Sequence, residues 1–235
     1  MKIILVGYGK MGKIIEATAL RRGHEIAARI DIDNVGELET AHGDVAIEFS
    51  HPDAAFNNLK TCLNRKLPVV CGTTGWLSQR NEIEELCQRV NGSFFYASNY
   101  SLGVNVFFKV NEYLARLMNA FPDYNIALDE THHTEKRDAP SGTAITLAEG
   151  ILKHVSRKSG WELEGKNENS NIPIASFRVD KVPGTHVIRY TSPVDTIEIK
   201  HTAHSREGFA LGAVMVAEWL PGRKGVLGMD DYLPL

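Results

Sequence analysis

The richest group of reactive side chains in the sequence lies between residues 130 and 143. Two adjacent histidines, His132 and His133, are followed by Lys136 and then by the polar run Ser141–Thr143. Histidine exchanges a proton near neutral pH because its unperturbed pKa is about 6.5. A lysine beside the start of a helix offers both a positive charge and free backbone N–H groups to an anion. This segment therefore predicts proton transfer next to a carboxylate or phosphate site.

The elements around this segment must bring those side chains together. Tyr124–His133 has the composition of a strand, so His132 and His133 should point to opposite faces. Ser141 is a favourable cap for a helix predicted over 143–157, and Gly142 and Thr143 begin that helix with unpaired N–H groups. Taken singly, each piece has a plain structural explanation as a cap, a turn or a solvated charge. Their concentration in one short run favours a binding and catalytic site.

Metal ligation is another interpretation of the histidines. Adjacent residues on a strand rarely bind one ion, and no matching carboxylate or thiolate spacing accompanies His132 and His133. His201 and His204 are expected to be surface or core residues. We therefore predict no metal.

A glycine-rich motif near the start of the chain predicts a nucleotide site. The GxGxxG residues are Gly7, Tyr8, Gly9, Lys10, Met11 and Gly12. They follow an apolar strand over Lys2–Val6 and open a helix predicted over Lys13–Arg22. In this context the first glycine permits a tight turn, the second lets the backbone approach a pyrophosphate, and the third allows close helix–strand packing.

Asp31 stands where a dinucleotide-binding unit carries its acidic residue, at the end of the second predicted strand. A carboxylate there accepts hydrogen bonds from the ribose hydroxyls and repels a 2′-phosphate, which favours NADH. Asp33 is a second candidate for this role, and Lys10 in the phosphate loop could admit NADPH. The expected cofactor is therefore NADH, NADPH or both.

Two further loops follow later predicted strands and should meet the same ligand. Parallel strands present their carboxyl ends at one edge of the sheet, where ligands bind. The residues concerned are Gly72, Thr73, Thr74, Ala97, Ser98, Asn99 and Tyr100.

The order of the predicted elements indicates two domains. Strands at Lys2–Val6, His24–Ile32, Asp44–Phe49, Pro68–Cys71 and Ser93–Ala97 alternate with helices at 13–22, 53–65 and 78–90, the last capped by Ser78. This alternation predicts a parallel sheet in an α/β, Rossmann-like dinucleotide-binding domain. A helix over 104–121 is followed by strands at 124–133, 174–181, 186–192 and 196–201, with an exposed polar excursion at 159–171 and a closing helix at 209–220. These predict an α+β substrate domain with a mixed sheet. We expect the first domain to comprise 1–102 and 211–235, and the second to comprise 103–210.

Composition excludes several classes of protein. The 235 residues carry a net charge of −3, which gives no electrostatic reason to expect nucleic acid or anionic lipid as a partner. No apolar run approaches the roughly 18 residues of a membrane span. Three cysteines without a CxxC motif argue against a disulfide framework, which favours a cytoplasmic protein.

Several motifs together resemble dihydrodipicolinate reductase, the 4-hydroxy-tetrahydrodipicolinate reductase of lysine and diaminopimelate biosynthesis. The run HHxxKxDAPSGTA within Glu130–Ala144 is similar to the family signature. The resemblance extends to Gly7–Gly12, to Cys71–Gly75, to ASNYSLGVN at 97–105, and to the later segments PGTH at 183–186 and IEIKHTAHSREGFA at 197–210.

The resemblance implies a reaction and roles for named residues. A reduced nicotinamide on the first domain would deliver hydride to ring C4 of a cyclic imine dicarboxylate, and the resulting enamine would be protonated at C3. His132 would be the general acid and Lys136 its partner. His133, Lys136, Ser141, Gly142 and Thr143 would hold the carboxylates. The family also implies a homotetramer built through the second domain's sheet.

Two other functions are compatible with parts of the sequence. One is another nicotinamide-dependent reductase of an amino-acid-derived imine, which the HHxxK and SGT segments disfavour. The other is a non-catalytic, NADH-binding redox sensor, which His132, His133 and Lys136 together disfavour.

Overall fold

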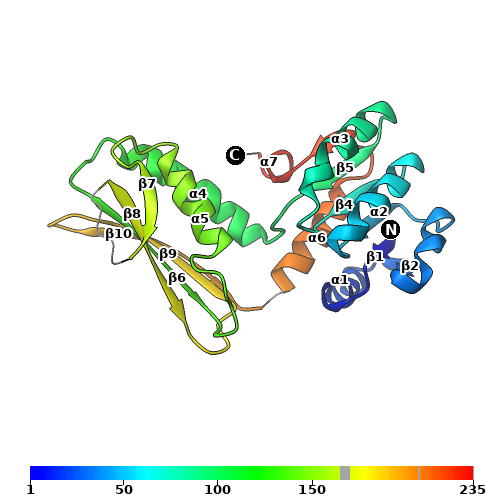
Figure 1. The fold of residues 1–235 in the computed structure, drawn as a ribbon, viewed down its shortest axis with the longest axis horizontal. Coiled ribbons are helices and arrows are strands. Elements are labelled where there is room, and N and C mark those ends of the chain that lie inside the picture. The colour runs from blue at the N-terminus through cyan, green and yellow to red at the C-terminus, as the bar shows by residue number, and fades with distance from the viewer. Residues whose placement is uncertain (165–169, 206, 235) are drawn as a thin grey trace. The chain divides into compact units, whose positions relative to one another are not determined.

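The computed structural model describes residues 1–164, 170–205 and 207–234. It divides into two compact units, Met1–Leu102 with Glu207–Leu235, and Gly103–Arg206. The second unit is therefore an insertion in the first (Figure 1). The chain returns to the first unit at Glu207, whereas the sequence analysis predicted this return at residue 211.

The first unit is a six-stranded parallel sheet with helices on both faces. Its strands are β1 (Lys2–Val6), β2 (Glu25–Ile30), β3 (Val45–Glu48), β4 (Val69–Cys71), β5 (Ser93–Tyr96) and β11 (Gly225–Leu227), in the order β11-β5-β4-β3-β1-β2. Its helices are α1 (Lys10–Arg21), α2 (Pro52–Asn64), α3 (Arg80–Arg89), α6 (Glu207–Trp219) and the short α7 (Met229–Tyr232), with 3₁₀ helices over Ile32–Glu39 and Leu77–Gln79. This arrangement confirms the predicted Rossmann-like fold.

Both faces of β1 are buried, which explains its continuous apolar run. Ile4 and Val6 pack into one core with residues of α2 and α3, whereas Ile3 and Leu5 pack into a second core with residues of α1 and α6. A strand buried on both faces cannot alternate polar and apolar residues. The carboxyl end of β1, from which the glycine-rich loop starts, is consequently packed between two cores.

The second unit is a five-stranded sheet packed against two helices, α4 (Leu102–Met118) and α5 (Gly142–Leu152). Its strands are β6 (Asn125–His132), β7 (Gly160–Leu163), β8 (Asn171–Arg178), β9 (Gly184–Thr191) and β10 (Thr196–Ala203), in the order β10-β9-β6-β8-β7. The pairs β10·β9 and β9·β6 are antiparallel, and β6·β8 and β8·β7 are parallel. The predicted mixed sheet is therefore confirmed.

The structure differs from the sequence prediction in several places. The second strand stops at Ile30, because Asp31 caps the 3₁₀ helix that follows. The third helix of the first unit begins at Arg80 rather than at the predicted cap Ser78. The polar segment 159–171 contains the strand β7, while residues 165–169 lie outside the described part of the chain. The strand β11 and helix α7 were not predicted at all.

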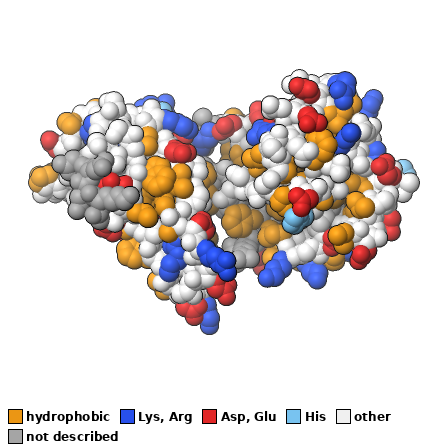
Figure 2. Space-filling model, viewed as in Figure 1, with side chains coloured by type: hydrophobic (Ala, Val, Ile, Leu, Met, Phe, Trp, Pro, Cys, Tyr) orange, Lys and Arg blue, Asp and Glu red, His pale blue; other side chains and the backbone are white. Residues whose placement is uncertain are grey.

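Surface properties agree with the composition. Basic and acidic side chains are interspersed over the face shown in Figure 2, without a large area of one sign. Among the described helices, none combines the length and apolar character needed to cross a membrane.

Candidate active site

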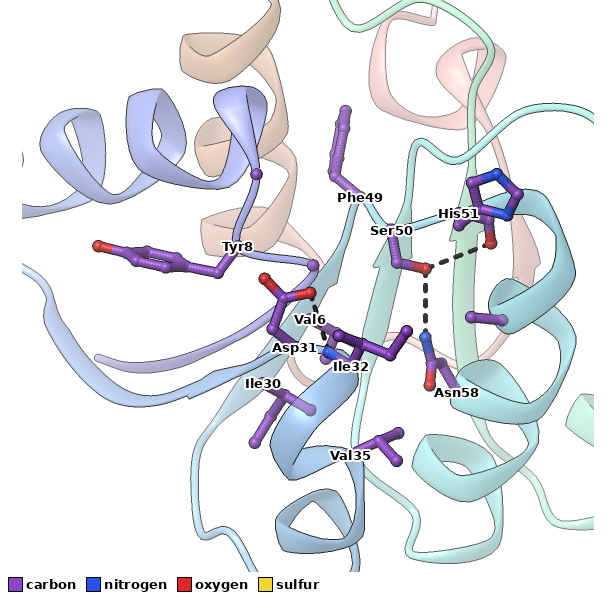
Figure 3. A pocket seen from close by; sticks show the side chains of 13 residues that line it. Val6, Tyr8, Ile30, Asp31, Ile32, Val35, Phe49, Ser50, His51 and Asn58 are labelled. Atoms are coloured by element: carbon purple, nitrogen blue, oxygen red, sulfur yellow. Dashed lines mark hydrogen bonds between the residues drawn. The ribbon is translucent and has the colours of Figure 1, made fainter.

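A cavity of about 470 Å³ opens where β1, β2 and β3 end (Figure 3). Its walls come from the glycine-rich loop, from the segment after β2 and from the segment after β3. The lining residues are Val6, Gly7, Tyr8, Gly9, Ile30, Asp31, Ile32, Val35, Phe49, Ser50, His51, Ala54 and Asn58. The cavity is apolar along its sides with a carboxylate at Asp31, which suits an adenosine moiety.

The glycines of the loop are required by close backbone contacts. Gly7 has φ +93°, and a Cβ there would lie 2.2 Å from the carbonyl oxygen of Phe49. A Cβ on Gly12 would lie 2.3 Å from the Gly7 carbonyl oxygen. Gly9 is the N-cap of α1 and its space is open, so the free N–H groups of the helix start are accessible. These residues fit a dinucleotide pyrophosphate.

Asp31 is exposed at the cavity and anchored through its backbone. Its Oδ1 accepts a hydrogen bond from the Ile32 N–H at 3.0 Å, and its own N–H donates to Asn34 Oδ1 at 2.7 Å. The carboxylate is exposed at the cavity, where a ribose hydroxyl can reach it. Asp33 is absent from the cavity lining, so Asp31 is the better placed of the two predicted acids.

A second cavity of about 330 Å³ shares Gly9, Phe49 and Ser50 with the first. It brings in the predicted residues Lys10, Met11, Gly72, Thr73 and Thr74, together with Pro52. The Ser50 N–H donates to Thr73 Oγ1 at 2.8 Å, and the Ser50 hydroxyl bonds the buried Glu48 carboxylate. These bonds fix the loops after β3 and β4 relative to each other. The two cavities together form one groove along the strand ends.

The predicted cofactor residues 97–100 line neither cavity. Tyr100 is only 1% exposed, and its hydroxyl donates to the Cys71 carbonyl at 2.7 Å, so it supports the end of β4. Ala97 is also buried, whereas Ser98 is exposed. Their contact with a cofactor stays a prediction.

In the second unit, a buried carboxylate lies at the centre of the predicted chemistry. Glu130 is completely buried near the end of β6. Its Oε2 lies 3.1 Å from His132 Nδ1 and 3.9 Å from His186 Nε2, and its Oε1 accepts from Arg178 Nη2 at 3.1 Å. His186 in turn lies 3.1 Å from Ser141 Oγ. Three strands and the start of α5 therefore converge on one carboxylate.

The electrostatics of this cluster keep Glu130 charged and His186 neutral. Burial alone would raise the pKa of Glu130, but the hydrogen bonds from surrounding side chains, His132 foremost, outweigh it and hold that pKa well below its usual value. Burial lowers the pKa of His186 to about 4, and the neighbouring His132 acts in the same direction. Near neutral pH the cluster thus contains one negative charge facing His132.

The loop carrying Lys136 is tied to the same cluster. Arg178 donates to the carbonyl oxygens of Lys136 and Asp138 as well as to Glu130. The Lys136 ammonium lies 2.8 Å from both carboxylate oxygens of Asp138, and this contact lowers the pKa of Asp138. Lys136 is therefore held near the protein surface with an exposed carboxylate as its partner.

The start of α5 has the geometry expected of an anion site. Ser141 is buried, and its hydroxyl accepts from the Ala144 N–H at 3.2 Å, so it caps the helix. Gly142 is exposed and has nothing within 4 Å of a built Cβ, and Thr143 is half-buried. The hydroxyl of Ser141 is thus engaged within the protein, and the accessible N–H groups belong to the residues after it. His133 is half-buried and lies just after β6, which ends at His132, so the predicted strand does not extend to it.

Glu130, His132 and His186 are also the one cluster among the described residues that could offer three ligands to a metal ion. One oxygen of the Glu130 carboxylate already pairs with the Arg178 guanidinium. That positive charge disfavours a cation beside it. The cluster is better explained as an ion-pair network.

Sequence analysis gave no role to Glu130, Arg178 or His186. The signal was present in the strand alternation, because Ile126, Leu128, Glu130 and His132 share one buried face. A glutamate on an otherwise apolar face requires a buried partner. In the first unit, Phe49 and Ser50 were missed because no motif marks them.

Comparisons with known proteins place these two units in one family. The family models for the N-terminus and the C-terminus of dihydrodipicolinate reductase match residues 1–100 and 103–233. The chain belongs to the dihydrodipicolinate reductase family. It is 49% identical to the 4-hydroxy-tetrahydrodipicolinate reductase of Christiangramia forsetii over 99% of this chain and 98% of that protein. It is 32% identical to the protein of the same name from Archaeoglobus fulgidus, over 96% of each.

The fold of this family member agrees with a solved structure. Dipicolinate-bound dihydrodipicolinate reductase from Paenisporosarcina sp. TG-14 matches 99% of each chain with a TM-score of 0.81 and 22% identity. As in other members of the family, the chain is an oxidoreductase that uses NADH or NADPH. The predicted family, fold class and cofactor are therefore confirmed.

Proposed function

We propose that the chain catalyses the NAD(P)H-dependent reduction of the cyclic imine dicarboxylate derived from 4-hydroxy-tetrahydrodipicolinate, in lysine and diaminopimelate biosynthesis. Family membership and the names of its relatives support this reaction. The observation that carries it is the convergence of His132, the Lys136 loop and the start of α5 on Glu130. No other function weighed from the sequence uses all three.

The groove of the first unit would hold the dinucleotide. The pyrophosphate would bind at the start of α1, over Gly7–Gly12, and Asp31 would hold the ribose. Gly72, Thr73 and Thr74 line the far part of the groove, which suits the nicotinamide end. When bound, the reduced nicotinamide supplies the hydride, which goes to ring C4 of the substrate.

The substrate carboxylates would bind in the second unit. Lys136, His133 and the N–H groups of Gly142 and Thr143 would hold them, and Ser141 would support this site as the cap of the helix. Each hydrogen bond between a charged group and its partner contributes about 1.5–3 kcal/mol. Lys136 now faces the exposed carboxylate of Asp138, so it already stands as a carboxylate-binding group. A dianionic ring would replace that contact with a closer one.

His132 would be the general acid that protonates ring C3. Its side chain is 10% exposed at the end of β6, and Glu130 lies against Nδ1. With Nδ1 against this carboxylate, Nε2 is the ring atom from which a proton would reach the substrate. Lys136 would orient the ring and assist proton delivery.

We also propose a homotetramer in the cytoplasm. Phe177 of β8 is exposed on the second sheet and Val179 is exposed just after that strand, and both would pack against another copy of the chain. All three cysteines are free and buried, as is usual in a reducing compartment.

Calorimetric titration with pyridine-2,6-dicarboxylate tests the assignment of the substrate site. We expect saturable binding that Lys136→Ala weakens at least about tenfold, because one charge-assisted contact is lost. Lys153→Ala is the matched control, since Lys153 pairs with Glu112 on the surface. Equal affinity of wild type and Lys136→Ala would contradict the proposed site.

A further inference from the structure

The buried Glu130 carboxylate has no contact with substrate or cofactor in the proposed reaction. A charged group without exposed surface is retained only where partners compensate its desolvation. Each oxygen of Glu130 has a nitrogen neighbour at 3.1 Å, Arg178 Nη2 on one side and His132 Nδ1 on the other. The carboxylate is therefore arranged between the proposed general acid and an arginine.

The orientation of the His132 ring follows from this contact. Nδ1 is buried without a hydrogen bond of good geometry to any described residue, and its close polar neighbour is the Glu130 Oε2 at 3.1 Å, which likewise has no other partner. A carboxylate accepts hydrogen bonds and donates none, so Nδ1 carries its hydrogen when it faces Glu130. The proton available for transfer is then the one on Nε2. Gly184 borders that side of the ring, where a Cβ would lie 3.1 Å from Nε2.

We propose that Glu130 is a positioning residue that holds His132 with Nδ1–H on the carboxylate, so that the proton for the substrate leaves from Nε2. Arg178 couples this arrangement to the loop of Lys136, because it also donates to the Lys136 carbonyl oxygen at 3.3 Å. The catalytic part of this inference rests on the proposed function, whereas the ring orientation does not.

Other charged groups near His132 do not provide the same effect. Arg178 on β8 and Lys136 in the loop are hydrogen-bond donors only, so neither can accept the Nδ1–H of His132. His186 on β9 is neutral at pH 7 because its pKa lies at about 4. His201 on β10 also contributes to lowering that pKa. Glu130 is thus the negative group that faces the ring.

Histidine ¹⁵N NMR of the wild-type protein tests the orientation without any activity. The His132 signals are identified by their loss in His132→Gln. We expect the neutral ring to carry its hydrogen on Nδ1, and we expect Glu130→Gln to shift the balance toward the Nε2–H form. An Nε2–H form in the wild type, or unchanged His132 signals in Glu130→Gln, would overturn the proposal.

Steady-state kinetics test the catalytic consequence. In Glu130→Gln, we expect kcat to fall at least about tenfold, since positioned proton transfer contributes about 10²–10⁴-fold. NADH affinity should stay unchanged. Gly184→Ala provides a second variant that displaces the ring and keeps the carboxylate.

Glu218→Gln is the matched control, because Glu218 also binds an arginine and a histidine, Arg22 and His24, in the first unit. We expect it to leave kcat and the His132 ¹⁵N signals as in the wild type. If a folded Glu130→Gln behaves like this control, the positioning role is overturned. If the wild type does not reduce the substrate at all, the proposed function fails and the NMR result alone decides the orientation of His132.

Discussion

Lowering the pH should destabilise the fold through His186 before any carboxylate of the cluster titrates. Burial, with help from His132, lowers the pKa of His186 to about 4, whereas a histidine in an unfolded chain titrates near 6.5. Between these values the unfolded chain binds a proton that the folded chain does not, so stability falls as the pH falls. At 1.36 kcal/mol per pKa unit, the full effect is about 3 kcal/mol.

Urea unfolding at pH 7 and pH 4.5, at one protein concentration, measures this effect. We expect the wild type to lose about 2 kcal/mol more over this interval than His186→Gln, which keeps a polar side chain beside Ser141 but does not titrate. The exposed His42 provides a control, and His42→Gln should keep the full pH dependence. Glu130 has a lowered pKa, so its contribution is lost at still lower pH. The same loss in wild type and His186→Gln would refute the reasoning.

Three further predictions concern the proposed cofactor and substrate sites. Asp31→Ala should raise the kcat/KM for NADPH relative to NADH, because it removes a carboxylate that repels a 2′-phosphate; an unchanged ratio would mean that another group binds the ribose. Gly7→Ala should weaken NADH binding at least about tenfold in a fluorescence titration, since its Cβ would lie 2.2 Å from the Phe49 carbonyl oxygen. An affinity equal to that of the wild type would show that the cofactor does not bind in this groove. Lys136→Ala should lower kcat about 10²-fold while the Kd for NADH stays near that of the wild type, and a parallel loss of NADH affinity would count against the division of roles between the units.

The parts of the fold that the sequence predicts well are those with local signals. The strand Lys2–Val6, the glycine motif and the helix after it form one continuous segment whose pattern needs no distant contact. The mixed sheet of the second unit was predicted from the strand-like segments that cluster late in the sequence. The short strands β7 and β11 were missed because they lie at sheet edges. There, pairing with one neighbouring strand determines whether a strand forms, and amino-acid composition gives little signal.

The centre of the candidate site could be predicted only in part. His132 and Lys136 are close in sequence, and a specific motif contains them both. Arg178 and His186 come from β8 and β9, and only strand register brings Glu130 opposite His186 and His132 opposite Arg178. Register depends on long-range pairing that one sequence does not reveal. The buried position of Tyr100 was not foreseen either, because it depends on the contact of its hydroxyl with the distant Cys71 carbonyl.

The most direct test of the account is a coupled absorbance assay with the purified chain. NADH or NADPH is present from the start, and freshly made 4-hydroxy-tetrahydrodipicolinate is added last. We predict that reduced-nicotinamide absorbance falls only after that addition, and that His132→Gln slows the fall at least about 10²-fold. No substrate-dependent fall in absorbance with either cofactor would contradict the proposed function.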